Sequence, residues 1–274
     1  MRVPFSADSL AEAMARRPVV LLGEVHDNLA QHAVRADALR SLLRSGARPA
    51  IAFEQFDRGQ QALLDRARSE VLPTGVDRVD HMIARAGGGA AAPGWRWDLY
   101  RPYLRLAIEY DLPIVAANLS RRDAMRVAEQ GFDAAFGATT ITEVGLDRLP
   151  EELLRAQQHA VDIGHCGLMP PSMFPSLARA QIARDVALAQ AIRPYLEQGV
   201  VLLAGNGHVR NDIGVPYFLT TEQRARSVSI GLVESGGESA EEEPAHFDMA
   251  MLTPAQPRED PCAMLRKRVP PSGG

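Results

Sequence analysis

The sequence predicts an α/β fold, a three-layer α/β/α sandwich with a mainly parallel sheet. Four short segments are apolar on both faces, as buried parallel strands are: 19–23, 50–54, 113–117 and 200–204. Helical patterns separate these segments, and strand followed by helix, repeated, implies right-handed crossovers between two helical layers. We expect one domain over residues 1–253, followed by a mobile, Pro-rich tail over residues 254–274.

Residues that favour helix ends lie at the ends of the predicted helices. Asn28 and Ser120 are suited to N-caps, and Gly46, Gly131 and Gly199 fall where C-caps are expected. The last long helix is apolar around most of its circumference, which predicts a central, buried position. The predicted helices cover residues 28–45, 57–70, 99–110, 121–130, 150–161 and 172–197.

Strand patterns without long helices between them follow residue 205. They lie at 215–220 (VPYFLT), 226–234 (RSVSIGLVE) and 246–252 (HFDMAML), and we expect them to complete the sheet or to add antiparallel edges. Two Gly-rich segments, 87–94 and 235–244, are predicted as mobile surface loops.

Composition and charge exclude several classes of protein. A net charge of -4 gives no electrostatic basis for binding nucleic acid. No apolar run reaches the length of a membrane span, and residues 1–18 lack the apolar core of a signal peptide. The sequence as given therefore predicts a cytoplasmic protein, or an envelope-associated or periplasmic one if a signal was removed. Cys166 and Cys262 would permit one bridge in an oxidising compartment, although a buried, inert Cys166 is the commoner case.

Polar side chains lie at the carboxyl ends of the four apolar strands predicted at 19–23, 50–54, 113–117 and 200–204. Glu24 and His26 come after the first, Glu54 ends the second, Asn118 follows the third, and His208 follows the fourth after two glycines. In open parallel sheets, ligands bind outside the carboxyl ends of the strands. The sequence therefore predicts a pocket at this edge, although each residue alone could instead be a helix cap or a hydrogen-bonded core residue.

The chemistry of this set suits acid–base catalysis or metal binding. A carboxylate beside an imidazole raises the pKa of the histidine and fixes its tautomer, and Glu24 and His26 stand two residues apart. As catalytic candidates we take Glu24, His26, Glu54 and His208, and as ligands for a divalent metal His26, Glu54 and His208. Asp27 and Asn28 are assigned to capping the next helix.

Further residues are candidates for the wall of the pocket. Arg184 and Asp185 lie in an otherwise apolar helix, where charge is costly unless it is paired or faces a cavity. The dinucleotide fingerprint, the P-loop and the nucleophile elbow are all absent from the sequence. The wall candidates are Asn118, His165, Arg184, Asp185, Asn206 and Arg210.

Several segments together resemble a known family. GEVHDN (23–28), FEQFD (53–57), WRWDLYRPY (95–103), IVAANLSR (114–121) and AGNGHVRNDIGVP (204–216) occur in this order. Across roughly residues 15 to 220 the chain resembles the ChaN-like haem-binding uptake family of the Tiki/TraB/erythromycin-esterase-like superfamily.

The resemblance implies an α/β/α sandwich, a role in iron uptake, and haem held between the subunits of a homodimer by tyrosine. The tyrosine candidates in this chain are Tyr217, Tyr100 and Tyr103. Other branches of the superfamily look like hydrolases, some of them metal-dependent. We therefore expect a protein that binds haem or another iron-related small molecule, or alternatively a hydrolase that uses the Glu/His pocket with or without a divalent metal. In a third reading the Glu/His cluster is purely structural.

Overall fold

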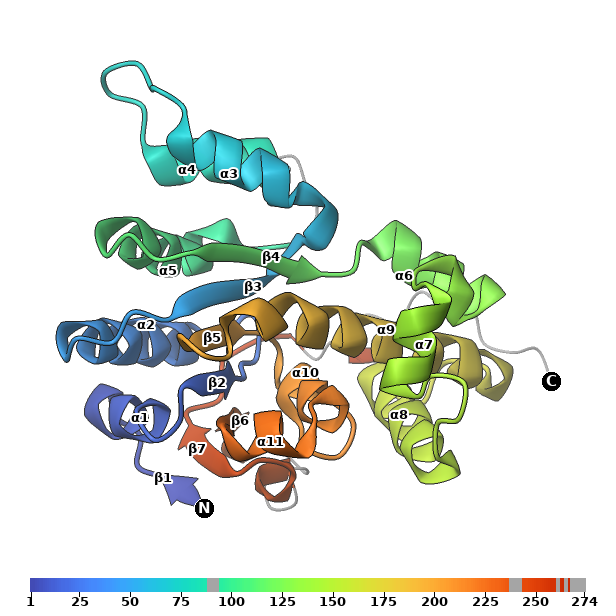
Figure 1. Cartoon of the computed structure of the whole chain (residues 1–274). Coiled ribbons are helices and arrows are strands. Elements are labelled where there is room, and N and C mark those ends of the chain that lie inside the picture. Colours follow the sequence, from blue (N-terminus) through green and yellow to red (C-terminus); the bar gives the residue numbers. More distant parts are fainter. Residues whose placement is uncertain (88–93, 237–242, 260–261, 264–265, 267–274) are drawn as a thin grey trace.

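The chain folds as an α/β/α sandwich around a parallel sheet, as the sequence predicts (Figure 1). The computed structural model describes residues 1–87, 94–236, 243–259, 262–263 and 266. Within them seven parallel strands pair in the order β1-β7-β6-β2-β5-β3-β4. The strands are β1 (Arg2–Val3), β2 (Val19–Leu22), β3 (Ala50–Asp57), β4 (Ile114–Asn118), β5 (Val200–Leu203), β6 (Ser227–Glu234) and β7 (Met249–Thr253).

Each face of the sheet has its own core, because successive side chains of a strand point to opposite faces. Val20 and Leu22 of β2 pack into one core, and Val19 and Leu21 into the other. The first core is covered by α1 (Ala7–Met14), α2 (Leu29–Arg44), α3 (Gln61–Ser69), α4 (Arg78–Ala86) and α5 (Trp97–Glu109). The second is covered by α6 (Arg121–Gln130), α7 (Ala138–Val144), α8 (Glu151–Gly164), α9 (Phe174–Ile192) and α10 (Asn206–Val209).

The predicted strands and N-caps of the central region agree with the structure, as does the C-cap at Gly131, but Gly199 is not a C-cap, because α9 ends at Ile192 with Arg193 as its cap. The Asn28 side chain accepts from the N–H of Gln31, and that of Ser120 from the N–H of Asp123. Helix α9 is buried along most of its length, as its apolar circumference predicts. The sequence analysis missed α1, α4, α7, α10, α11 (Thr221–Ala225) and the short strand β1. No described helix has the length and apolar character needed to cross a membrane.

Two predictions for the carboxyl-terminal region need correction. Residues 215–220 are not a strand, because Val215–Phe218 form a 3-10 helix, η6, that begins with Pro216 near its first position. Proline lacks the N–H that a strand ladder needs and fits the first turn of a helix. Strands β6 and β7 complete the sheet in parallel, and the antiparallel alternative is therefore wrong. The predicted loops at 87–94 and 235–244 lie largely outside the described residues.

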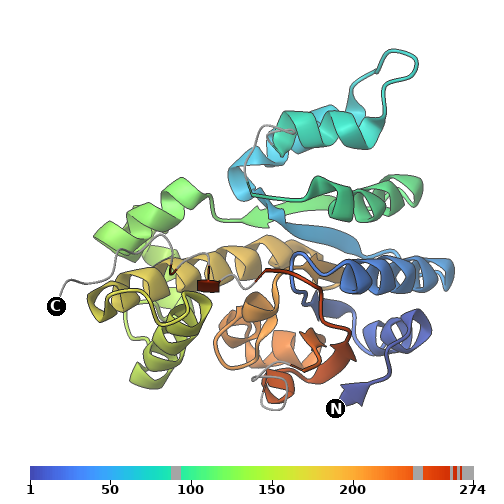
Figure 2. The same cartoon turned by 180° about the vertical axis from the view of Figure 1, so that it is seen from behind.

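The described part of the tail follows β7 across the back of the domain (Figure 2). Side chains fasten it to the domain at two points. The Arg258 guanidinium pairs with the carboxylates of Asp27 and Glu234. Cys262 forms a disulfide with Cys166, with 5.6 Å between their Cα atoms. Cys166 is therefore not the inert thiol that the sequence analysis favoured. The domain boundary at residue 253 stays a prediction.

The order of the strands creates a crevice at the carboxyl edge of the sheet. Neighbouring strands β2 and β5 are followed by α2 and α10, which pack on opposite faces. Such a reversal leaves a gap between the chain segments that leave the two strands, and ligands of open α/β sheets bind there. The candidate residues after β2 and β5 therefore stand on either side of this crevice.

Candidate functional site

Glu24 lies at the end of β2 and is almost completely buried, with 2% of its surface exposed. Its carboxylate forms an ion pair with the fully buried guanidinium of Arg35 on α2. The hydroxyl of Tyr100 donates a 2.5 Å hydrogen bond to Glu24 Oε1. Burying a carboxylate is costly unless it is paired and hydrogen-bonded, and these two partners satisfy that condition.

The same carboxylate orients His26. Nδ1 of His26 lies 2.9 Å from Glu24 Oε1, and because an ionised carboxylate only accepts, Nδ1 carries the proton and donates. The other ring nitrogen, Nε2, is then the one that faces away from Glu24. The ring stands edge-on to Trp95, with 4.9 Å between ring centroids, and 47% of the side chain is exposed.

A glycine allows the His26 ring to lie against the main chain after β5. A Cβ atom at Gly205 would come within 2.9 Å of Cε1 and Nε2 of His26, closer than real Cβ contacts. The N–H of Gly205 donates a 2.7 Å hydrogen bond to Oε2 of Glu54 on β3. The three strand ends β2, β5 and β3 thus meet through His26, Gly205 and Glu54.

His208 lies between two buried carboxylates. Its Nδ1 is 2.6 Å from Oδ1 of Asp185 on α9, and its Nε2 is 3.5 Å from Oε1 of Glu54. Burial lowers the pKa of His208, but the attraction of Asp185 and Glu54 outweighs it and raises the pKa to about 10. Burial raises the pKa of Glu54, and the attraction of His208 outweighs it and lowers the pKa to about 2. At neutral pH this side of the crevice therefore holds an imidazolium.

Supporting hydrogen bonds hold this group in place. Nε2 of Gln157 on α8 donates a 3.2 Å hydrogen bond to Oδ2 of Asp185. Burial raises the pKa of Asp185 to about 6, against the attraction of His208, so that Asp185 is still largely ionised near neutral pH. The carboxylate that orients His208 is itself oriented, as it is around many catalytic histidines.

Glu24, His26, Asp185 and His208 line one pocket with a volume of about 480 Å³. That volume is within the range of small-molecule sites, about 300–1,000 Å³. Its walls combine the charged floor with the apolar side chains of Val25, Ala160, Val161 and Ile213. Of the predicted residues it is lined by Glu24, His26, His165, Asp185, Asn206, His208 and Arg210.

Other predicted residues lie beside the pocket without lining it. The Arg184 guanidinium donates 3.0 and 2.9 Å hydrogen bonds to Oδ1 of Asn118 and the carbonyl of Leu119. Asn118 in turn donates to the carbonyl of Glu54, at 2.9 Å. Arg184 and Asn118 therefore hold β3, β4 and α9 together beneath Glu54. Glu54 is buried at 5% exposure and joins the site through Gly205 and His208.

The three tyrosine candidates also lie outside the pocket lining. Tyr100 and Tyr103 are fully buried, and burial raises the pKa of each phenol. The Tyr100 hydroxyl is taken up by Glu24, and that of Tyr103 donates a 3.0 Å hydrogen bond to the carbonyl of His32. Tyr217, on η6, packs partly buried against Phe218. The phenols of Tyr100 and Tyr103 are thus held in hydrogen bonds and kept protonated, and Tyr217 is held in a packing contact.

The described residues contain no group of three or more His, Cys, Asp and Glu side chains arranged to hold a metal ion. His26 and His208 each direct Nδ1 to a carboxylate, and Nε2 of His208 faces Glu54. The three residues predicted to bind a metal therefore take part in carboxylate–imidazole contacts: His26 contacts Glu24, and His208 contacts Glu54 and Asp185.

Sequence reasoning missed Arg35, His32 and Gln157. A signal for the first two was present, because His32, Arg35 and Leu39 follow the spacing of one helical face, and that face is otherwise apolar. Burial lowers the pKa of His32 to about 4, which leaves it neutral beside the Glu24–Arg35 pair. Gln157 carries no comparable signal in the sequence.

Comparisons with known proteins identify the family and the fold. The family model "Haem-binding uptake, Tiki superfamily, ChaN" matches residues 10–219. A structure of ChaN from Campylobacter jejuni with cofacially bound haem is 19% identical, covering 84% of this chain and 87% of that chain, with a TM-score of 0.65. A mutant of the erythromycin esterase EreC in its open conformation is 14% identical, covering 84% and 72%, with a TM-score of 0.44.

The comparison with curated proteins found no match. At 19% identity, the likeness to the Campylobacter protein establishes the fold. The family model extends over most of the sequence, including every strand end that contributes to the pocket. The chain therefore belongs to the ChaN-like haem-binding uptake family of the Tiki superfamily.

Proposed function

We propose that the protein binds haem in the pocket at the carboxyl edge of the sheet. The observation that carries this proposal is the donor set of the pocket within a chain of the haem-binding uptake family. Two histidines, His26 and His165, line the pocket with Nδ1 directed to an oxygen atom, 2.9 Å and 2.7 Å away. Histidines that bind metals almost always have this second hydrogen bond.

The walls of the pocket also suit a porphyrin. Ala160, Val161 and Ile213 offer an apolar surface to a flat macrocycle. Arg210 also lines the pocket, where its guanidinium pairs with Asp212 at 2.6 Å and a haem carboxylate would compete for it. The chemistry of the pocket lining therefore fits haem. Haem, when bound, would supply iron with an open coordination position. That the protein forms a homodimer around haem, and takes part in iron uptake, remain predictions from the family.

Haemin titration with a variant that fills the pocket tests this proposal. Ala160→Trp places an indole on the pocket wall, whereas Glu152→Trp places one on the exposed face of the same helix. We expect a saturable Soret change for the wild type and for Glu152→Trp, and weaker binding for Ala160→Trp. Wild-type protein that gives no saturable change, or equal affinity in all three proteins, would contradict haem binding in this pocket.

A second candidate function is hydrolysis, favoured by the Glu24–His26 pair. A histidine whose Nδ1 is oriented by a carboxylate has the arrangement of a general base, although Nε2 of His26 lies beside Gly205. None of the described residues that line the pocket is Ser, Thr or Cys, and the nucleophile would therefore be water. His26 would take a proton from water as the oxygen attacks a carbonyl carbon, and would return it to the leaving group. The cationic His208 would stabilise the charge that develops on the carbonyl oxygen.

Chromogenic esters distinguish this function from haem binding. We expect His26→Gln to lower kcat for p-nitrophenyl esters by about 100-fold or more, the contribution of a positioned acid or base. The matched control is His159→Gln, an exposed histidine on α8 outside the pocket lining. Wild-type rates equal to the buffer background would remove the hydrolase candidate and leave haem binding untouched.

We further propose that the protein works in an oxidising compartment, the envelope or periplasm, and not in the cytoplasm. The Cys166–Cys262 disulfide supports this location, because structural disulfides persist mainly in oxidising surroundings. Mass spectrometry of protein alkylated in its native cells tests it. We expect both cysteines to resist alkylation until a reductant is added, whereas alkylation without reductant would point to the cytoplasm.

A further inference from the structure

We infer that the carboxyl-terminal tail, when closed by its disulfide, is a strap that holds two walls of the pocket together and so tightens ligand binding. The identity of that ligand rests on the proposed haem binding. The described residues of the tail, 254–259 and 262–263, lie beyond residue 219, where the match to the family model ends. The family model therefore does not include the strap.

The first anchor of the strap lies at the β2 wall of the pocket. The Arg258 guanidinium donates two hydrogen bonds to the carboxylate of Asp27, at 2.9 and 2.8 Å. Such a two-point pair fixes direction as well as distance. Nδ2 of Asn28 donates a 2.9 Å hydrogen bond to the carbonyl of Pro254. Because Asp27 directly follows His26, which lines the pocket, the tail is attached one residue away from this wall.

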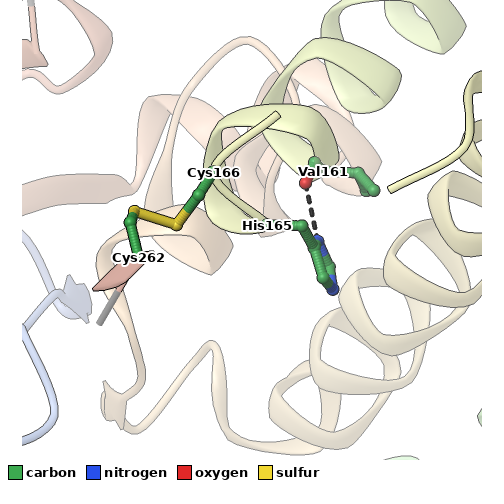
Figure 3. The surroundings of a disulfide bond; sticks show 4 residues. All are labelled: Val161, His165, Cys166 and Cys262. Carbon is green, nitrogen blue, oxygen red and sulfur yellow. Dashed lines mark hydrogen bonds between the residues drawn. A yellow bond between two sulfur atoms is a disulfide. The ribbon is translucent and has the colours of Figure 1, made fainter. Parts of the chain in front are cut away.

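The second anchor lies at the end of α8, which forms another wall. Figure 3 shows the disulfide of Cys166 and Cys262 there, on the opposite side of the turn from the His165 ring. His165 and Gly164 both line the pocket. The covalent anchor is therefore also one residue away from the pocket lining.

Helix α8 benefits from this anchor because it packs on the domain along one side. Its buried residues are Leu153, Gln157 and Val161. Beyond them, the last turn carries Ile163 with 59% of its surface exposed. Segments with few buried contacts open more readily than the core of a protein. The disulfide thus attaches α8 at an exposed end, where its packing is weak.

The strap is short enough to restrain the two walls. Four residue steps separate Arg258 from Cys262, and a chain of that length spans at most about 14 Å. None of the described tail residues lines the pocket, and the strap therefore ties the walls from outside without filling the space between them. A site whose walls are already held in place loses less conformational entropy when a ligand binds. Closing the strap should therefore tighten binding.

Haemin titrations of the oxidised wild type and three variants test the strap. Cys166→Ser combined with Cys262→Ser opens one anchor, and Arg258→Gln opens the other. Arg155→Gln, which removes an exposed ion pair of α8 with Glu151, is the control. We expect each variant with an open strap to bind haem about fivefold more weakly or worse, the lower end of the usual range for coupled sites. Arg155→Gln should bind as the wild type does.

Hydrogen exchange of the haem-free proteins gives a readout that does not depend on haem. We expect the amides of residues 161–165 to exchange faster in both variants with an open strap than in the wild type. In Arg258→Gln, which keeps the disulfide, the amides of α9 should exchange as in the wild type. Arg155→Gln should match the wild type in both segments.

The possible outcomes separate the strap from the proposed function. If the wild type does not bind haemin saturably, haem binding fails, and faster exchange at the end of α8 in the variants with an open strap still supports the strap. If the wild type binds and these variants keep its affinity, haem binding stands and the control of binding by the strap is wrong. Unchanged exchange of residues 161–165 would likewise overturn it, because α8 would then be held without the tail.

Discussion

Glu24 is the residue on which the buried charges of the site converge. Its carboxylate meets Arg35, Tyr100 and His26, and it is therefore both a structural anchor and the group that orients His26. The sequence predicted the neighbourhood of Glu24 and His26 from their spacing. It named Tyr100 as a haem-ligand candidate but gave no sign of its contact with Glu24, which lies 76 positions away and is reached only through the packing of α5.

Glu24→Gln should strongly destabilise the protein. The substitution leaves the Arg35 guanidinium buried without a counter-charge, and breaking such a pair costs about 3–5 kcal/mol of unfolding free energy. Asp37→Asn is the control, since Asp37 pairs with Arg40 at the exposed surface and should cost less than about 1 kcal/mol. Urea denaturation measures both values, and similar losses in the two variants would show that the Glu24–Arg35 pair is not the buried anchor described above.

His208 should make stability fall at alkaline pH. Its pKa in the folded protein is raised to about 10 from 6.5. Its contribution is therefore complete below about pH 6.5 and is lost as the pH rises through 10. We expect the free energy of unfolding to decline between pH 7 and 10 more steeply in the wild type than in His208→Gln. Parallel profiles over this range would mean that the raised pKa is absent.

At the scale of elements, the site depends on Gly205, the N-cap of α10, and not on Gly207 within that helix. Gly205→Ala would push a methyl group against the His26 ring, whereas a Cβ atom at Gly207 meets nothing within 4 Å. We expect Gly205→Ala to weaken haem binding and any ester hydrolysis, and Gly207→Ala to leave both unchanged. Haemin titration and ester assays check this pair, and equal effects of the two substitutions would remove Gly205 from the account of the site.

The helices and strands of the central region could be predicted because their periodicity is strong and local. The 19-residue helix α9 and the strands around it follow apolar patterns that tertiary contacts do not overrule. The strand predicted at 215–220 was wrong because its local signals conflict. Val, Tyr and Phe favour strands, whereas Pro216 favours a helical turn. The pairing of Cys166 with Cys262 could not be derived, because their proximity depends on the path of the tail.

The disulfide should stabilise the fastened tail and α8. Cross-linking cysteines 96 positions apart restricts the unfolded chain, and loss of such a bond typically costs about 2–5 kcal/mol. We expect the melting temperature of the wild type to fall under reducing conditions. The variant with Cys166→Ser and Cys262→Ser should melt at the lower temperature with or without reductant. A wild-type melting temperature that reductant does not change would contradict a stabilising role.

At the scale of the whole molecule, the order of the strands places the site. The sequence could indicate four polar strand ends, but not that β5 lies between β2 and β3, which brings His208 beside Glu54 and Gly205 beside His26. That adjacency depends on the crossover directions of the entire chain. The pocket follows from it, with the crevice between β2 and β5 as its floor and α8 as one wall.

Haemin titration of the purified wild-type protein, followed by its Soret band, tests the central claim most directly. The account predicts saturation at about one haem per chain, because ligand pockets of this kind are few in a protein. It also predicts that Ala160→Trp, which fills the pocket, weakens binding while Glu152→Trp does not. A Soret change that fails to saturate, or one that is indifferent to Ala160→Trp, would contradict haem binding at the carboxyl edge of the sheet.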